Sequence, residues 1–231
     1  MEWRAVGILC CGWFILWMHR GAYPRPHIRP GASRRELVEA LAIVAALLLL
    51  PHLRLSMLWY TDWLGPYLML GLWAPYLMEI LLRGRSLTLI GVAKPLNLPK
   101  LQVVGYICGL FLLSKIVDPL SVAAGPYGVI TWSWSTILVF PLVEEVLFRG
   151  LLQTRLEALM GTARAWLCSG ALFGAYHYYV NHFVPGRPPT PEQILSLVYL
   201  AAFGMLLGAM AAKTRSLLPS FLVHALNNLS L

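Results

Sequence analysis

Eight apolar runs divide this chain and restrict the folds that it can adopt. The runs cover residues 3–18, 37–53, 63–82, 101–117, 128–152, 164–181, 193–212 and 216–231. A helix needs about 20 mostly apolar residues to cross the hydrocarbon core of a membrane, and shorter runs can span by thinning the bilayer. Hydrophobic residues make up 58% of the sequence and charged residues only 12%, which is outside the balance of a soluble domain. We therefore expect an all-α fold, a polytopic transmembrane helical bundle of about eight spans.

The distribution of basic residues supports this topology. Lys and Arg collect in the cytoplasmic loops of membrane proteins, and eight spans place 13 of the 18 basic residues on one side, with both termini on the other. The net charge of +8 is spread over short loops without the basic patch of a nucleic-acid-binding protein, so we expect a lipid bilayer and no nucleic acid as partner. No shift in composition marks a soluble domain, and residues 1–231 are predicted to form a single integral membrane domain.

Two adjacent glutamates, Glu144 and Glu145, lie deep in the run 128–152, and Arg149 follows them in the same run. Each ionisable group at the centre of a membrane helix costs about 2.5–3.5 kcal/mol, so three in one span indicate a functional site. Glu145 and Arg149 are four residues apart and can form an ion pair within the helix. Glu144 projects about 100° away and is left to take up and release a proton as a general base. The alternative is an ion-pair network that only holds the bundle together.

Two later runs carry polar residues at helical spacing. Phe173 and His177 are four residues apart in the run 164–181, and His224 and Asn228 are four residues apart in the last run. At about 1.5 Å per residue, Glu144 and both histidines lie roughly 14–20 Å from arginines of the same cytoplasmic side. One carboxylate and two imidazoles are therefore expected in one layer near the middle of the membrane.

Three motifs in this order resemble those of the CPBP intramembrane proteases, a family that includes the type II CAAX prenyl endopeptidases and the bacterial Abi-like proteins. They are Glu144-Glu145-Val-Leu-Phe-Arg149, Phe173-Gly-Ala-Tyr-His177 and His224-Ala-Leu-Asn-Asn228. The resemblance covers residues 128–231, which would form the catalytic core. It implies a glutamic-type endopeptidase that cuts a membrane-associated protein or peptide, with CAAX-like or C-terminal-tail processing as the model. Family members of this size imply a multi-pass protein of a prokaryotic cytoplasmic membrane.

By position, the resemblance implies that Glu144 and His177 activate a water molecule, and that His224 and Asn228 stabilise the oxyanion. Glu145, Arg149 and Phe173 would support these residues.

A zinc ion held by Glu144, His177 and His224 is the competing mechanism. No H-E-x-x-H motif is present, and we favour catalysis without a cofactor. Two other functions remain open. Buried Glu and His also line transporters and proton relays, and the bundle could be a catalytically silent scaffold.

Overall fold

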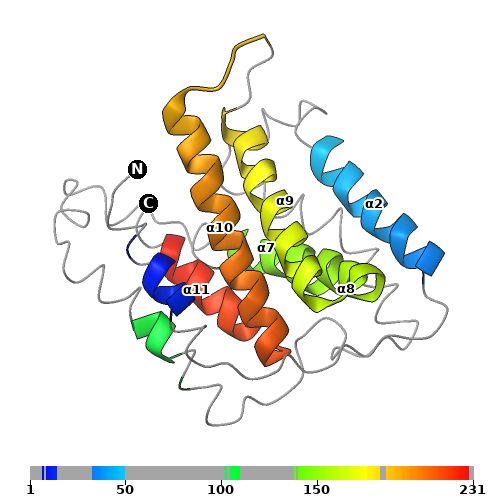
Figure 1. Cartoon of the computed structure of the whole chain (residues 1–231), viewed down its shortest axis with the longest axis horizontal. Helices are drawn as coiled ribbons and strands as arrows, with labels where there is room; N and C mark the ends of the chain where they lie inside the picture. Colours follow the sequence, from blue (N-terminus) through cyan, green and yellow to red (C-terminus); the bar gives the residue numbers. More distant parts are fainter. Residues whose placement is uncertain are drawn as a thin grey trace.

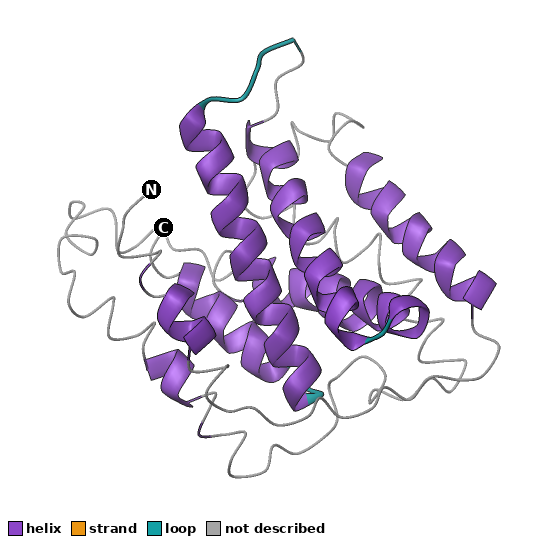
Figure 2. Ribbon diagram, viewed as in Figure 1, coloured by secondary structure: helices purple, strands orange, loops and turns teal. Residues whose placement is uncertain are grey.

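The computed structural model of the chain describes residues 7, 9–14, 33–49, 102, 105–109, 138, 140–182 and 186–228. Helices dominate this part of the chain, which contains no strand (Figure 2). The all-α prediction is thus confirmed for the described residues. The longer elements are α2 (Ser33–Leu49), α7 (Phe140–Glu145), the π-helix η3 (Val146–Gln153), α8 (Thr154–Met160), α9 (Thr162–His182), α10 (Pro191–Thr214) and α11 (Leu218–Asn228) (Figure 1).

Four of the predicted spans coincide with helices. The runs 37–53, 164–181, 193–212 and 216–231 overlap α2, α9, α10 and α11, respectively. Within the described ranges, one helix, α10, is both long and apolar enough to cross a membrane. The predicted span 63–82 and large parts of the spans 3–18, 101–117 and 128–152 fall outside these ranges. The number of eight spans therefore stays a prediction.

The helix that carries the two glutamates continues further than its apolar run. The run ends at residue 152, whereas the helix continues through Arg155 and Glu157 of α8 to Met160. Both side chains are buried, and both are paired with other parts of the chain. Arg155 Nε lies 3.0 Å from Glu39 Oε2, and Glu157 Oε2 lies 2.6 Å from Arg215 Nη1. Each pair offsets the cost of burying its charges, so the helix continues to Gly161, whose φ of 81° breaks it.

Helices α9 and α10 lie side by side and form the centre of the described structure (Figure 1). Their backbones approach closely because glycines face the contact. A Cβ added to Gly174 of α9 would lie 2.6 Å from the backbone nitrogen of Ala201, which is closer than real Cβ atoms approach other atoms. Small residues permit the same close approach between membrane helices in general.

The π-helix η3 packs against this pair and reaches α10 through two polar side chains. Arg149 Nη2 donates a hydrogen bond of 2.9 Å to the Gly204 carbonyl oxygen, and Gln153 Nε2 donates one of 3.0 Å to that of Gly208. Donors and acceptors are each four residues apart, so the two bonds join one turn of η3 to one turn of α10. Segments of π-helix occur often at functional sites, and η3 begins directly after Glu145.

Candidate functional site

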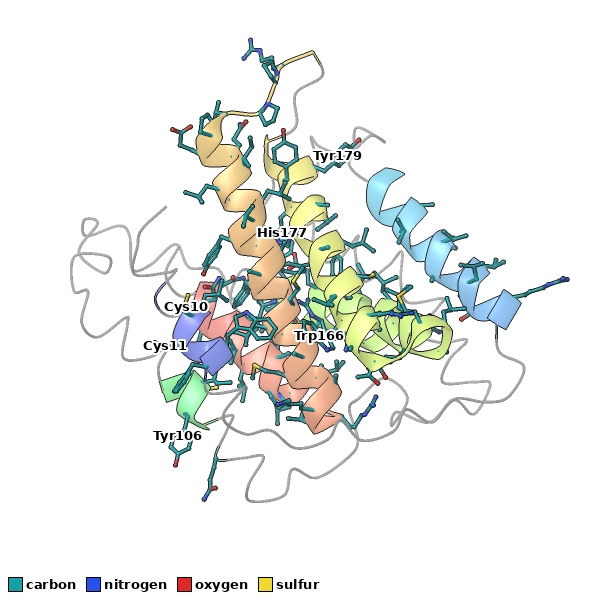
Figure 3. All side chains as sticks on the ribbon, in the orientation of Figure 1. Cys10, Cys11, Tyr106, Trp166, His177 and Tyr179 are labelled. Atoms are coloured by element: carbon teal, nitrogen blue, oxygen red, sulfur yellow. The ribbon has the colours of Figure 1, made fainter. Side chains whose placement is uncertain are left out.

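Three helices bring four titratable side chains into contact. Glu144 and Glu145 end α7, His177 lies near the end of α9, and His224 lies in the middle of α11. Figure 3 labels His177 on α9, at the centre of the described helices. Glu145 and His224 are buried, Glu144 is 9% exposed, and His177 is partly buried. The cluster is therefore largely removed from solvent, and Glu144 and His177 are its more exposed members.

Glu144 lies between the two imidazoles. Its Oε2 atom is 3.5 Å from His177 Nε2 and 3.5 Å from His224 Nε2. These separations are at the outer limit for direct hydrogen bonds. The three side chains therefore converge on one place without being locked to one another.

The other nitrogen of each imidazole has a well-placed acceptor. His177 Nδ1 lies 3.0 Å from the Phe173 carbonyl oxygen, and His224 Nδ1 lies 3.0 Å from Glu145 Oε1. A carbonyl oxygen and an ionised carboxylate only accept hydrogen bonds, so each Nδ1 carries a hydrogen and donates it. In the neutral form of either ring, Nε2 then presents a lone pair toward Glu144.

Glu145 has two partners. Its Oε1 atom is 3.1 Å from Arg149 Nη1, which is the ion pair that the spacing of four residues predicts. The same oxygen accepts the hydrogen of His224. Sequence reasoning missed this second contact because Glu145 and His224 are 79 residues apart, and helical spacing identifies only neighbours within one helix.

Aromatic rings surround both imidazoles. Phe173 has its ring centroid 4.3 Å from that of His177 and 5.6 Å from that of His224. Tyr176 lies 5.4 Å from His177, and Phe203 of α10 lies 5.7 Å from His224. Tyr176 directly precedes His177 in the sequence, and this position next to a motif histidine is the signal that points to it. Phe203 was not among the predicted site residues, and its only signal in the sequence is that it is an aromatic residue in an apolar run, which is equally typical of core packing.

Asn228, the fourth residue of the predicted catalytic set, is the last residue of α11 and is partly buried. It follows His224 by one helical turn, so it lies on the same side of the helix. The preceding residue, Asn227, accepts a hydrogen bond of 3.3 Å from the hydroxyl of Tyr199 on α10. The end of α11 that carries Asn228 is thereby attached to α10.

Glu144, His177 and His224 are the donors that the zinc alternative requires, and both imidazole Nε2 atoms lie 3.5 Å from Glu144 Oε2. Across the ranges that the structure describes, no group of three or more His, Cys, Asp and Glu side chains is arranged to hold a metal ion.

One comparison with known proteins gave a match. Residues 126–230 match the model of a protein family described as type II CAAX prenyl endopeptidase Rce1-like. No curated protein and no solved structure matches the chain. The matched residues include all three motifs, and the match confirms the family resemblance that those motifs indicate.

Proposed function

Because residues 126–230 belong to the Rce1-like family of type II CAAX prenyl endopeptidases, we propose that this protein is an intramembrane endopeptidase. It hydrolyses a peptide bond near the C-terminal tail of a membrane-associated protein or peptide. The observation that carries this proposal is the convergence of His177 Nε2 and His224 Nε2 on Glu144 Oε2. A carboxylate and two imidazoles that meet in a largely buried cluster form a set of acid and base groups suited to hydrolysis.

The nucleophile is a water molecule held by Glu144 and His177. Ionised Glu144 and neutral His177 both present lone pairs, because the Nδ1 hydrogen of His177 is donated to the Phe173 carbonyl. A water that donates one hydrogen to each acceptor has its oxygen lone pairs turned outward, toward a substrate carbonyl. As the oxygen attacks, one proton passes to this pair of acceptors and is later delivered to the leaving amine.

The negative charge that develops on the substrate carbonyl oxygen is stabilised by His224 and Asn228. The side-chain amide of Asn228 is a neutral donor, and His224 donates from Nε2 when that atom carries a proton. Donors of this kind typically contribute about 10²–10³ in kcat each. Glu145 accepts from Nδ1 of the same ring and offsets the positive charge of the protonated form. Arg149 neutralises Glu145 while Nε2 of His224 is unprotonated.

The chain is proposed to work as a multi-pass protein of a prokaryotic cytoplasmic membrane. The Rce1-like family is membrane-embedded, and the apolar helix α10 agrees with that setting. A bilayer also supplies the substrate class, since a tail carrying a lipid reaches a membrane-embedded site by lateral diffusion. A CAAX-like tail is the first substrate to test.

The test is a cleavage assay with purified protein in lipid nanodiscs and a lipidated tail peptide, with the products identified by mass spectrometry. Wild-type protein is expected to cleave, and both Glu144→Gln and His224→Ala are expected to lose at least about 100-fold in kcat. Glu192→Gln is the matched control, because it makes the same change at an exposed carboxylate in the first turn of α10. Cleavage should be unchanged by a chelator. Cleavage that a chelator abolishes and zinc restores would replace this mechanism with a metal-dependent one.

A further inference from the structure

Phe173 contacts three residues of the site. Its ring lies beside His177 at a centroid distance of 4.3 Å and meets His224 edge-on at 5.6 Å. The guanidinium carbon of Arg149 lies 4.5 Å from the centre of the same ring. The backbone carbonyl of Phe173 also accepts the Nδ1 hydrogen of His177. One residue thus touches both imidazoles and the arginine that binds Glu145.

Hydrogen bonds at Nδ1 do not by themselves fix an imidazole. The bond holds only one atom of the ring. The second side-chain torsion of histidine has a broad distribution of allowed angles, so the plane of the ring can still tilt about that atom. Such a tilt moves Nε2, which is the atom that faces Glu144 in both histidines. A rigid ring packed against each imidazole removes this freedom, and Phe173 supplies such a surface to both.

Phe173 is itself held from several sides. The ring of Phe148 meets it edge-on at 5.1 Å, and Arg149 covers it. On the α10 side, a Cβ added to Gly204 would lie 2.9 Å from Phe173 Cβ and 3.0 Å from its ring, so the absence of a side chain at Gly204 makes room for it. The Phe173 side chain is 1% exposed.

We propose that Phe173 is a positioning residue that fixes the planes of both imidazoles, so that their Nε2 atoms point at the reacting atoms. This inference rests on the proposed function for its effect on rate, whereas its effect on the imidazoles can be measured separately. Phe203 contacts only one of the two imidazoles, that of His224, at a centroid distance of 5.7 Å, and it helps to fix the plane of that ring alone.

Neighbouring rings provide a matched series of variants. Phe148 is as buried as Phe173, and its rings within contact are those of Phe173 and Tyr176, not those of the histidines. A Phe→Leu substitution removes the same aromatic ring at each position. The ring that is lost contacts no imidazole in Phe148→Leu, one in Phe203→Leu and two in Phe173→Leu. A purely structural role predicts similar losses of stability and activity at all three positions.

The experiment measures kcat and KM of the three variants in nanodiscs, at a temperature well below each unfolding midpoint. Misplacing catalytic groups by about 1 Å can cost about 100-fold in rate, so we expect kcat to fall about 100-fold for Phe173→Leu and about 10-fold for Phe203→Leu, with KM little changed. Phe148→Leu should keep kcat within about threefold of wild type, because its ring touches neither imidazole and Arg149 and α10 still hold the Phe173 ring when the Phe148 ring is removed. Equal kcat values for Phe148→Leu and Phe173→Leu would overturn the proposal.

A second measurement does not depend on catalysis. With ¹⁵N-labelled histidine, the rings of His177 and His224 should each give one narrow set of signals in wild type and Phe148→Leu. In Phe173→Leu, both should broaden or split, and in Phe203→Leu only those of His224 should do so. Unchanged signals in Phe173→Leu would overturn the proposal even in an active enzyme. If the wild type cleaves nothing, the proposed function fails, but the signals still decide the positioning role. If Phe173→Leu does not fold, Phe203→Leu against Phe148→Leu decides it.

Discussion

The same substitution should have different effects at the two adjacent glutamates, lowering mainly the stability at Glu145 and mainly the catalytic rate at Glu144. Replacing either Glu144 or Glu145 with Gln exchanges a carboxylate for an amide of similar shape and removes one negative charge, and both positions lie in the same turn of helix α7. Glu145 is fully buried, is paired with the buried Arg149 at 3.1 Å and accepts from His224 at 3.0 Å. Glu144 is slightly more exposed than Glu145, and its contacts with both imidazoles are 3.5 Å long. Glu145 should therefore matter for stability and Glu144 for chemistry.

The magnitudes follow from these contacts. Removing one partner of a buried ion pair typically costs about 3–5 kcal/mol, because the other charge stays buried without its counter-ion. Glu145→Gln leaves the Arg149 guanidinium with the Gly204 carbonyl and the ring of Phe173, so its free energy of unfolding should fall by about that amount. For Glu144→Gln, the two long contacts predict a change below about 1 kcal/mol.

Both quantities can be measured on the same preparations. Unfolding in mixed micelles of increasing denaturing detergent, followed by tryptophan fluorescence, gives the difference in stability, and the peptide assay gives kcat. Arg149→Met combined with Glu145→Gln should be less destabilised than the sum of the single variants, because the double variant has no lone buried charge. Equal losses of stability at Glu144 and Glu145, or a greater loss at Glu144, would refute this assignment of roles.

Two further predictions concern the helices that carry the site. Gly174→Ala places a Cβ 2.6 Å from the backbone nitrogen of Ala201 and should cost about 1–3 kcal/mol, while Gly105→Ala, which meets nothing within 4 Å, should be close to neutral in the same unfolding assay. Equal effects of the two alanines would show that α9 and α10 are not packed as closely as described. Tyr199→Phe removes the hydrogen bond to Asn227 and should cost about 1 kcal/mol and lower kcat through the adjacent Asn228, with KM unchanged. A kcat equal to that of wild type would separate this bond from catalysis.

The sequence was most informative where a residue's role depends on its own helix. The predicted bounds differ by at most two residues from the helix bounds for the runs 164–181 and 193–212. A helix in apolar surroundings needs an apolar run of about its own length, so such a run predicts where the helix begins and ends. The ion pair of Glu145 and Arg149 follows from helical spacing in the same way. The motifs also identified His177 and His224, which the structure brings to Glu144.

Contacts between distant segments were not accessible in this way. The burial of Arg155 and Glu157 depends on Glu39 of α2 and on Arg215, which directly follows α10, so spacing within their own helix does not predict it. The bond from His224 to Glu145 and the contact of Phe203 with His224 depend likewise on how helices far apart in the chain are packed. No periodicity in a single segment encodes such contacts.

The role of Glu144 in activating water can be tested by comparing the cleavage rate of Glu144→Gln with those of wild type and Glu192→Gln. All three proteins would be purified in parallel, confirmed as folded by tryptophan fluorescence, and incubated with the lipidated tail peptide. If Glu144 activates the water, wild type and Glu192→Gln form products at equal rates, and Glu144→Gln forms them at a rate at least about 100-fold lower. Folded Glu144→Gln protein that cleaves the peptide at the wild-type rate would contradict this role of Glu144.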